Sequence, residues 1–243
     1  GFDDARMQER EWLSYVRGLY KLKPGRGRMF ASTAAVIAGS RHTASEMPST
    51  VSDRLIWLPE NAIDPARFNM VSPQDIPGPI RGCFIGRLVP YKGPDILLEA
   101  AGPALKSGRF RLDILGDGPM RPALEAQVRE QGLGDAVTFH GMVPHTQVQT
   151  IATRANLLTF PSIREFGGGV VLEAMVLGLV PLIVDYAGPG ELVGDGLGYK
   201  VPIGTRAEIV ARFRDRLETI LDAPGELPGI AARARAHALE HFT

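Results

Sequence analysis

The chain has 243 residues, 44% of them hydrophobic, and its 27 Lys and Arg residues equal its 27 Asp and Glu residues in number. This length predicts one large domain or two small ones with an ordinary apolar core. The zero formal net charge argues against nucleic acid as a partner, so an anionic ligand has to meet a local cluster of cations. No apolar run reaches the roughly 18 residues of a membrane span, and the first residues do not resemble a signal peptide.

Residues 1–50 are predicted to be mainly helical. Apolar residues between Trp12 and Tyr20 recur at helical spacing among basic residues. This pattern favours a surface helix packed on a domain, and the alternative is a basic helix that touches a membrane surface.

Short elements follow before the first proline-rich stretch. Residues 31–38 are expected to end as a buried strand, and Ser40 is expected to cap a helix over 41–48. Residues 54–58 are expected to form another short strand. The stretch 71–79 contains three prolines and is the best candidate for a linker.

Beyond this linker, short apolar runs alternate with helical segments. Strands are predicted at residues 80–86, 110–115, 136–140, 156–160 and 180–184. Helices are predicted at residues 94–105, 119–131 (with Pro119 at its first position), 146–154, 170–177, 204–222 and 228–242. Strands that alternate with helices indicate an α/β fold, a parallel sheet with helices on both faces and ligands at the carboxyl ends of its strands.

Cys83, the single cysteine of the sequence, lies in the first of these apolar runs. A thiol in such a run is predicted to be buried in a strand. One cysteine forms no internal disulfide, which suits a reducing compartment, and we therefore expect a cytoplasmic protein.

The loop after the first predicted strand of this region reads Gly86-Arg87-Leu88-Val89-Pro90-Tyr91-Lys92-Gly93. Arg87 and Lys92 stand five residues apart, at the end of the strand where a ligand is expected. Arginine binds phosphate through two parallel hydrogen bonds, and lysine adds a point charge. Taken alone, two such cations are more often solvated surface charges, so the loop needs support from a second feature.

That second feature is the loop after residue 160, which carries Gly167, Gly168 and Gly169 and leads into a helix. Glycine lets a backbone approach a ligand closely, and the first amides of a helix suit a phosphate. Glu165 and Glu173 flank this stretch, and carboxylates bind sugar hydroxyls rather than a diphosphate. The pattern indicates a nucleotide-sugar site, and the simpler interpretation is a glycine-rich turn with glutamates at a helix start.

Two other motifs are weaker. Residues 237–241, His-Ala-Leu-Glu-His, fit a zinc-peptidase pattern, but a solvated helix explains them better. Residues 188–194 have spaced glycines after a strand, but the third glycine comes one residue too late for a dinucleotide-binding loop. The sequence contains no Asp-x-Asp pair, so we expect no catalytic metal.

Four motifs occur in a fixed order: Gly86-Arg87 with Lys92-Gly93, Gly116-Asp117-Gly118-Pro119, Phe139-His140-Gly141-Met142-Val143-Pro144, and Glu165 with Glu173-Ala174-Met175. Together they resemble the C-terminal domain of family-4 retaining glycosyltransferases, the bacterial group 1 enzymes of the GT-B fold. The resemblance covers residues 31–240 and implies a Rossmann-like domain that binds a nucleotide-sugar donor. One departure is Phe166-Gly167-Gly168-Gly169, where the family has Gly-Phe-Gly after its first glutamate.

The resemblance also assigns roles to residues of this chain. Arg87 and Lys92 would bind the donor pyrophosphate, and Glu165 would bind the donor sugar, which makes these three the expected catalytic residues. Glu173 would bind the ribose. The remaining donor-binding positions would be Met142 and Val143 beside the base, and Gly86, Gly167, Gly168, Gly169, Val170 and Val171.

In this family two domains face each other. The resemblance divides the chain into a remnant of the acceptor-side domain at 1–70, the linker 71–79 and a donor-binding domain at 80–243. Asn61 and Asp64 resemble the motif that ends the first domain. The chain starts with glycine instead of methionine, and a complete pair of domains needs roughly 300 residues or more, so we expect a fragment of a longer protein.

The expected function is metal-independent transfer of a hexosyl-type sugar, with retention of configuration, from a nucleotide-diphosphate-sugar. The acceptor would be a glycan, a lipid-linked glycan or a small molecule, in polysaccharide or glycoconjugate biosynthesis. Two alternatives stay open, a nucleotide-sugar-binding fragment without turnover and a sugar-nucleotide 2-epimerase on the same fold. No cofactor is expected, and peripheral contact with the inner face of the membrane would come through the first domain.

Overall fold

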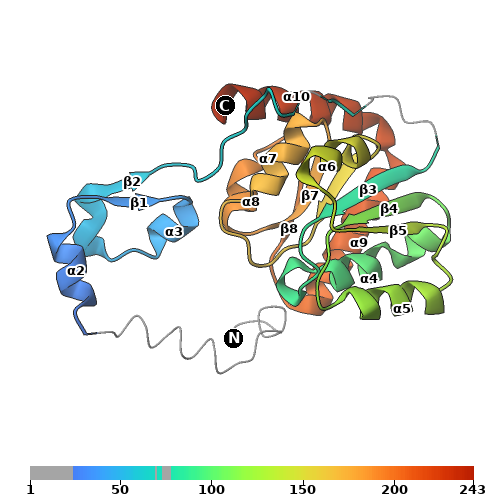
Figure 1. Cartoon of the computed structure of the whole chain (residues 1–243), viewed down its shortest axis with the longest axis horizontal. Helices are drawn as coiled ribbons and strands as arrows, with labels where there is room; N and C mark the ends of the chain where they lie inside the picture. Colours follow the sequence, from blue (N-terminus) through green and yellow to red (C-terminus); the bar gives the residue numbers. More distant parts are fainter. Residues whose placement is uncertain (1–23, 69, 73–77) are drawn as a thin grey trace.

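The structure, a computed structural model, describes residues 24–68, 70–72 and 78–243. These residues form two parts of unequal size (Figure 1). We call residues 24–57 the small part and the rest of the described chain from residue 61 onward the large part. After residue 57 a single connecting segment without regular secondary structure leaves the small part and runs along the large part.

The small part is built around two short parallel strands, β1 (Val36–Ala38) and β2 (Leu55–Trp57). The side chain of Ser40 accepts a hydrogen bond from the Thr43 amide, so the predicted helix cap is confirmed. The helices are α2 (Arg26–Ser32), α3 (Arg41–Ser45) and the 3-10 helix η1 (Ser49–Arg54).

Two expectations for the small part were wrong in detail. Residues 31–38 do end as a strand, Val36–Ala38, but this strand is not buried as expected, since Ile37 is 65% exposed. The helix predicted over 41–48 ends at Ser45, because Pro48 disfavours a helical conformation in the residue before it. The predicted basic helix around Trp12 lies outside the described residues.

The large part contains a six-stranded sheet in which all neighbouring strands are parallel. Its order is β5-β4-β3-β6-β7-β8. Every residue of β6 is buried, and so is all of β7 except its last residue, as expected for strands covered on both faces. The strands are β3 (Ile80–Ile85), β4 (Phe110–Leu115), β5 (Val137–Gly141), β6 (Leu157–Phe160), β7 (Val180–Asp185) and β8 (Tyr199–Pro202).

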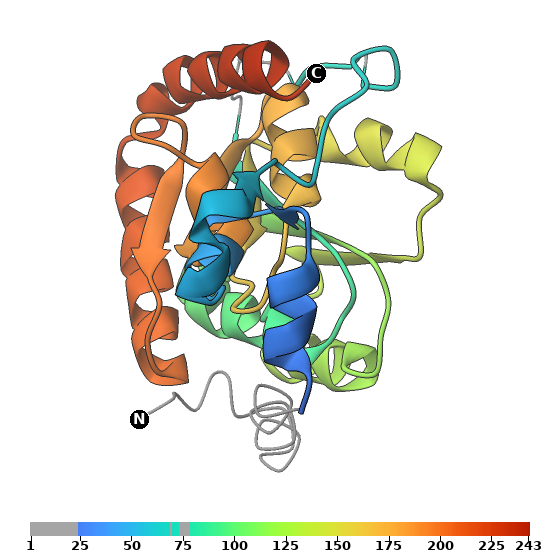
Figure 2. The ribbon, with the colours of Figure 1, turned by 90° about the vertical axis from the view of Figure 1, so that its left-hand side faces the viewer.

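Helices cover both faces of this sheet (Figures 1 and 2). On one face α4 packs against α9 with α5 beside it, and on the other α7 packs against α10 with α6 beside it. The predicted α/β fold class is therefore confirmed. The helices are α4 (Pro94–Lys106), α5 (Arg121–Glu130), α6 (His145–Ala152), α7 (Gly169–Val176), α9 (Arg206–Asp222) and α10 (Leu227–His241).

Three features of the large part differ from the prediction. The strand β8 was not predicted, because it has four residues and only one of them is buried. The short helix α8 (Ala187–Leu192) was not predicted either, because its sequence contains two glycines and a proline. Helix α5 begins at Arg121 with a proline in its second position, since the Met120 amide donates to the Leu88 carbonyl of a neighbouring loop.

The strand order reverses direction between β3 and β6. From β3 the chain adds β4 and β5 on one side, and from β6 it adds β7 and β8 on the other. The loops that follow β3 and β6 therefore leave the sheet toward opposite faces and open a crevice between them. These are the two loops, residues 86–93 and 161–168, in which the sequence predicts the ligand site.

The first residues of the large part pack on the rest of it. Ile63 and Phe68 are each 6% exposed and belong to the same apolar core as the sheet. The Ser72 amide donates to the Leu177 carbonyl at 2.7 Å, and the Ile63 amide donates to the Phe242 carbonyl at 2.6 Å. The domain boundary at 70 and the linker over 71–79 stay predictions, since residues 73–77 lie outside the described chain.

Three strands end side by side through contacts of bare backbone. The Gly116 amide donates to the Gly141 carbonyl at 2.8 Å, and the Gly86 amide donates to the Leu115 carbonyl at 2.9 Å. Gly116 has a φ of 132°, and a side chain there would overlap the carbonyl oxygen of Gly86. Only glycine adopts this φ readily and leaves room for the Gly86 carbonyl oxygen. Gly116 therefore lets the ends of β3 and β4, and the loops that start there, lie against each other.

We expect Gly116→Ala to lower the free energy of unfolding by about 3 kcal/mol or more, because it adds steric overlap to an unfavourable φ. Gly134→Ala is the matched control, since nothing lies within 4 Å of a Cβ at that glycine. It should change stability by less than about 0.5 kcal/mol. Denaturant titration of both variants makes the comparison, and equal losses would contradict the assigned role of Gly116.

Candidate functional site

The loop after β3 is anchored by buried apolar residues, and its two cations differ in exposure. Leu88 is fully buried, and its amide donates to the Asp117 carbonyl at 2.9 Å. Arg87, the preceding residue, is exposed. Lys92 ends the 3-10 helix η2 (Pro90–Lys92) and lies largely covered, with its side chain 16% exposed.

Lys92 and Glu165, predicted for the phosphate and for the sugar, are brought into direct contact. The ammonium group of Lys92 donates to Oε2 of Glu165, whose side chain is 18% exposed. The same ammonium lies 5.1 Å from the centre of the Phe160 ring, a distance suited to a cation–π contact. The loops after β3 and β6 thus meet through a lysine–glutamate ion pair, as expected for loops on the two sides of the crevice.

The glycine-rich loop ends at the start of α7. Gly168 adopts a left-handed φ of 73° and serves as the N-cap, so the helix begins at Gly169, one residue before the predicted start. The first amides of a helix have no carbonyl partner within it and carry its positive dipole end. The amides of Gly169 and Val170 therefore form a place where an anion is favoured.

The segment that leaves the small part covers this loop from outside. A side chain at Gly167 would overlap the amide group of Asn61 and lie 2.8 Å from Oε2 of Glu60. One at Gly169 would lie 3.0 Å from Oδ1 of Asn61. Gly167 and Gly169 are therefore needed because the connecting segment packs against them. The sequence had suggested a different reason, the close approach of a ligand.

Glu173 lies one turn into α7 and faces His145 and Arg67. Its carboxylate is 3.4 Å from Nε2 of His145, the first residue of α6, and it also feels the charge of Arg67. Burial raises the pKa of Glu173 above its ordinary value, and His145 and Arg67 only partly offset that effect. His145 was missed in the sequence, although its place after Pro144, just beyond β5, puts it at the carboxyl edge.

The remaining predicted positions also lie at this edge. Met142 directly follows β5 and is 77% exposed, whereas Val143 packs against the core. Between them and Arg87 runs the loop after β4, whose Asp117 pairs with Arg121 at 2.8 Å. The structure therefore gathers every predicted site residue at the carboxyl ends of β3, β5 and β6.

His140, part of the motif at the end of β5, has a structural role. Its Nε2 lies 2.7 Å from Oδ1 of Asp113, and Arg81 donates to Oδ2 of the same carboxylate at 3.0 Å. Asp113 is only 5% exposed, so these two partners compensate a charge buried inside the sheet. Burial also raises the pKa of the neighbouring Cys83 thiol, which is fully buried as predicted.

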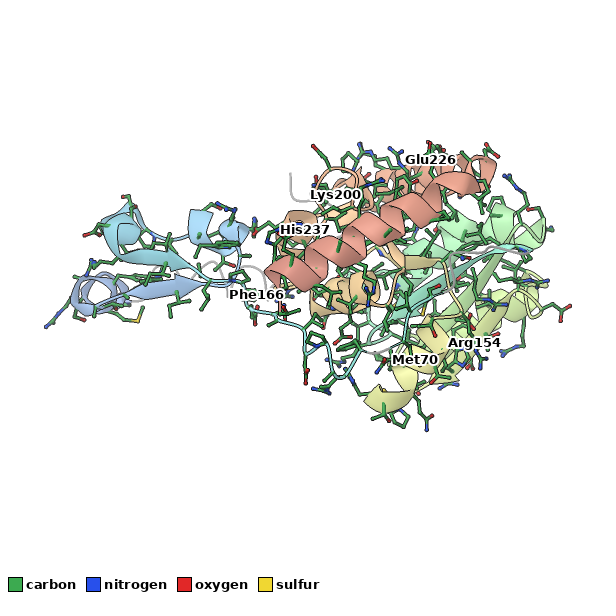
Figure 3. The ribbon with its side chains drawn as sticks, turned by 90° about the horizontal axis from the view of Figure 1, so that it is seen from above. Met70, Arg154, Phe166, Lys200, Glu226 and His237 are labelled. Carbon is green, nitrogen blue, oxygen red and sulfur yellow. The ribbon has the colours of Figure 1, made fainter. Side chains whose placement is uncertain are left out.

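A cavity of about 510 Å³ opens between the small part and the lysine–glutamate pair. The start of α3 forms one wall, and the loops after β3, β6 and β7 form the other. Phe166, 54% exposed, stands at the junction of the two parts (Figure 3). The residues that line this cavity include His42, Thr43, Tyr91, Lys92, Glu165 and Phe166.

Residues 188–194, which have spaced glycines, form α8 and the turn after it instead of a separate dinucleotide loop. A Cβ at Gly188 would lie 2.7 Å from the backbone carbon of Gly167 and would overlap the carbonyl oxygen of Phe166. This helix therefore packs backbone to backbone against the glycine-rich loop.

Neither metal ligation nor a membrane span is evident in the part of the chain that the structure describes. No three His, Cys, Asp or Glu side chains of these residues are grouped as a metal site. None of the described helices is long and apolar enough to cross a bilayer.

Gly188→Ala should lower the free energy of unfolding by about 2–4 kcal/mol, because the new methyl group would overlap the backbone of Phe166 and Gly167. Gly194→Ala is its control, since the nearest atom to a Cβ there is a leucine methyl at an ordinary 3.5 Å. Thermal denaturation of the two variants tests this, and a Gly188→Ala protein as stable as the control would show that α8 does not press on the loop.

Glu173→Gln should raise the melting temperature at pH 7 by about 1–3 °C. The pKa of Glu173 is higher in the folded protein than in the unfolded chain. Its contribution to stability is therefore complete at pH values below the unfolded-state pKa, and it is lost as the pH rises through the folded-state pKa. The difference between variant and parent should therefore vanish near pH 4. Melting curves at both pH values check this, and a less stable variant at pH 7 would contradict it.

The sequence matches the family of glycosyl transferases group 1 over residues 72–223. It is 30% identical to 2-deoxystreptamine glucosyltransferase of Streptomyces kanamyceticus over 67% of this chain and 43% of that protein. It is 32% identical to D-inositol 3-phosphate glycosyltransferase of Gordonia bronchialis over 74% of this chain and 45% of that protein. The chain thus spans less than half the length of these relatives.

Solved structures share the fold at low sequence identity. Anabaena Alr3699/HepE, in complex with UDP and glucose, superposes with a TM-score of 0.70 at 22% identity, over 86% of this chain and 59% of that one. The C-terminal domain of the Francisella tularensis group 1 protein LpcC gives a TM-score of 0.64 at 21% identity, over 74% of this chain and 98% of that one. These structures show the shared fold, and the family match over residues 72–223 establishes that the chain belongs to the glycosyl transferases of group 1.

Proposed function

We propose that the large part binds a nucleotide-diphosphate-sugar and supports transfer of its sugar to an acceptor, with retention of anomeric configuration. The observation that carries the proposal is the meeting of Lys92 and Glu165 across the crevice, beside the start of α7. A cation, a carboxylate and free helix amides at one place match a ligand that carries both a diphosphate and hydroxyl groups.

The proposed division of labour follows the chemistry of each group. Arg87, Lys92 and the amides of Gly167 to Val171 hold the diphosphate, and Glu165 accepts hydrogen bonds from the hexose. Glu173 accepts from the ribose, and the backbone at Gly86, Met142 and Val143 surrounds the nucleoside. Relatives named as glucosyl- and inositol-phosphate glycosyltransferases, and a structural neighbour that holds UDP and glucose, support this assignment.

The proposed chemistry needs charge stabilisation at the leaving group. As the bond from the anomeric carbon to the diphosphate breaks, negative charge grows on the phosphate oxygens, and Arg87, Lys92 and the dipole of α7 stabilise that charge. Side-chain cations fill the place of a metal in this scheme. The acceptor oxygen attacks from the face that the diphosphate leaves, and the large part supplies no general base for it.

Glu165 and Lys92 neutralise each other in the free protein, so the donor exchanges one ion pair for two separate interactions. The diphosphate binds Lys92, and the hexose hydroxyls donate hydrogen bonds to Glu165. A nucleotide without sugar leaves Glu165 without its new partner. We therefore propose that only the complete nucleotide-sugar supplies partners for both Lys92 and Glu165. The site then binds the nucleotide-sugar substrate more tightly than the nucleotide product.

Because the chain spans less than half of its relatives, a second candidate is a nucleotide-sugar-binding unit without turnover on its own. A sugar-nucleotide 2-epimerase on the same fold would act on the donor alone, so incubation without an acceptor separates it from a transferase. We further propose a glycan, lipid-linked or small-molecule acceptor, a role in polysaccharide or glycoconjugate biosynthesis, and a cytoplasmic location with peripheral membrane contact.

Arg87→Ala and Lys92→Ala should each weaken the binding of UDP by about 10- to 100-fold, since each removes a charged partner of the diphosphate. Isothermal titration calorimetry with UDP measures the loss. Arg129→Ala, at an exposed position on α5, removes the same charge away from the site and should leave the affinity unchanged. Unchanged UDP affinity in the first two variants would refute their role.

Glu165→Ala should weaken UDP-glucose at least about tenfold more than it weakens UDP. The variant loses the partner of the hexose, but it also frees Lys92 for the diphosphate, so UDP itself should bind as well as before or better. Calorimetry with both ligands gives the ratio. Equal losses for the two ligands would place Glu165 away from the hexose.

A further inference from the structure

Helix α8 bridges the two parts of the protein, and neither the sequence motifs nor the proposed chemistry gives it a role. It begins at Ala187, whose φ of 46° makes it the only non-glycine residue with a positive φ in the described chain. Such backbone strain persists only where the surrounding structure determines the conformation. The contacts on both sides of α8 show what determines it here.

One side of α8 is tied to the glycine-rich loop. The Gly188 amide donates to the Phe166 carbonyl at 3.1 Å. A Cβ at Gly168 would lie 3.0 Å from the backbone nitrogen of Pro189, so the two backbones touch here as well. A shift of α8 therefore displaces the loop that precedes α7.

The other side of α8 holds the small part through Glu191. Its Oε2 accepts from the Arg41 amide at 2.7 Å, and its Oε1 accepts from the His42 amide at 2.8 Å. These two amides open α3 and have no acceptor within that helix, while Ser40 satisfies the third, that of Thr43. The carboxylate also faces the positive end of the α3 dipole.

A second contact runs beside this one. The rings of His42 and Tyr186 lie edge to face with their centres 5.0 Å apart, and the Tyr186 hydroxyl is 3.4 Å from Nε2 of His42. Tyr186 is the N-cap residue of α8, so the start of α3 contacts both ends of that helix. Figure 1 shows α3 and α8 facing each other across the gap between the parts.

We propose that Glu191 is a positioning residue that locks the small part onto α8 and so couples it to the glycine-rich loop. The lock sets the width of the 510 Å³ cavity, because His42 and Thr43 on α3 form one wall and Lys92 and Glu165 form the other. Without the carboxylate, the small part moves about its connecting segment. The effect on sugar transfer rests on the proposed function, but the lock itself does not.

The test measures the distance between the two parts. Spin labels at Thr50→Cys and Asp215→Cys, both exposed positions, report it by pulsed electron paramagnetic resonance. Cys83 is fully buried and stays unlabelled in the folded protein. In Glu191→Gln the side chain keeps one acceptor oxygen, but its NH2 group faces a backbone N–H of α3. The population in which the small part is docked on α8 should therefore fall by about tenfold relative to the population in which the two parts are apart. The distance distribution should become broader and longer.

Asp195→Asn is the matched control, because it removes one negative charge from an exposed position four residues further along. Its distribution should superimpose on that of the parent protein. A Glu191→Gln distribution that also superimposes would overturn the proposal. Melting curves of the labelled proteins confirm that the distances come from folded chains.

A second pair of variants tests the same lock from the small part. Arg41→Pro removes the N–H that Oε2 accepts from, at the first position of α3, where proline is tolerated, and Ser40 before it is already extended. Arg41→Ala loses the same side chain, including its contact with the Trp57 ring, but keeps the N–H. The proline variant should open the two parts as Glu191→Gln does, and the alanine variant should not. Equal behaviour of the two would overturn the role of the amide.

UDP titrations separate this proposal from the proposed function. If the parent protein does not bind UDP, the nucleotide assignment fails while the distance result stands. If it binds, UDP should narrow the distance distribution in the parent protein and have a weaker effect in Glu191→Gln. A UDP response that is the same in both proteins would overturn the coupling to the loop.

Discussion

The parallel pairing of β3 with β6 is the constraint on which the rest of this molecule depends. The two strands meet over Gly82–Leu157 and Cys83–Leu158, in the middle of the sheet. Gly82 has no side chain because the Phe110 ring and the Thr159 methyl group occupy the space that a Cβ would need. Since the strand order reverses at this pair, the loops that follow it diverge, and the functional groups gather in the crevice between them.

Charge at this crevice is balanced locally, in a chain whose net charge is zero. Lys92 and Glu165 neutralise each other while both are largely covered, which avoids the cost of an isolated buried charge. Glu173 is less well compensated, because burial outweighs the attraction of His145 and Arg67. Such residues cost stability in the free protein and are expected where a ligand supplies the missing partners.

The contact between the two parts gives the crevice its outer wall. The small part exposes apolar side chains on its strand pair, with Ile37 65% and Ile56 50% exposed, and it meets the large part mainly at α3. Backbone amides and one carboxylate make this contact, together with an aromatic pair. Polar, directional contacts of this kind fix an orientation with little buried area, so small changes at α8 are able to change the spacing of the walls.

The sequence alone determined the α/β class, five of the six strands of the sheet and the two loops of the site, because apolar runs, glycines and charged residues follow local rules. It also placed Arg87, Lys92 and Glu165 in those loops, and Glu173 in the helix that follows the second loop. It missed His145 and Glu191, which have no local pattern, since their partners lie 28 and about 150 residues away in the chain. Strand order, the direct contact of Lys92 with Glu165 and the conversion of residues 187–192 into a bridging helix were decided by tertiary structure, because each depends on which distant backbones pack together.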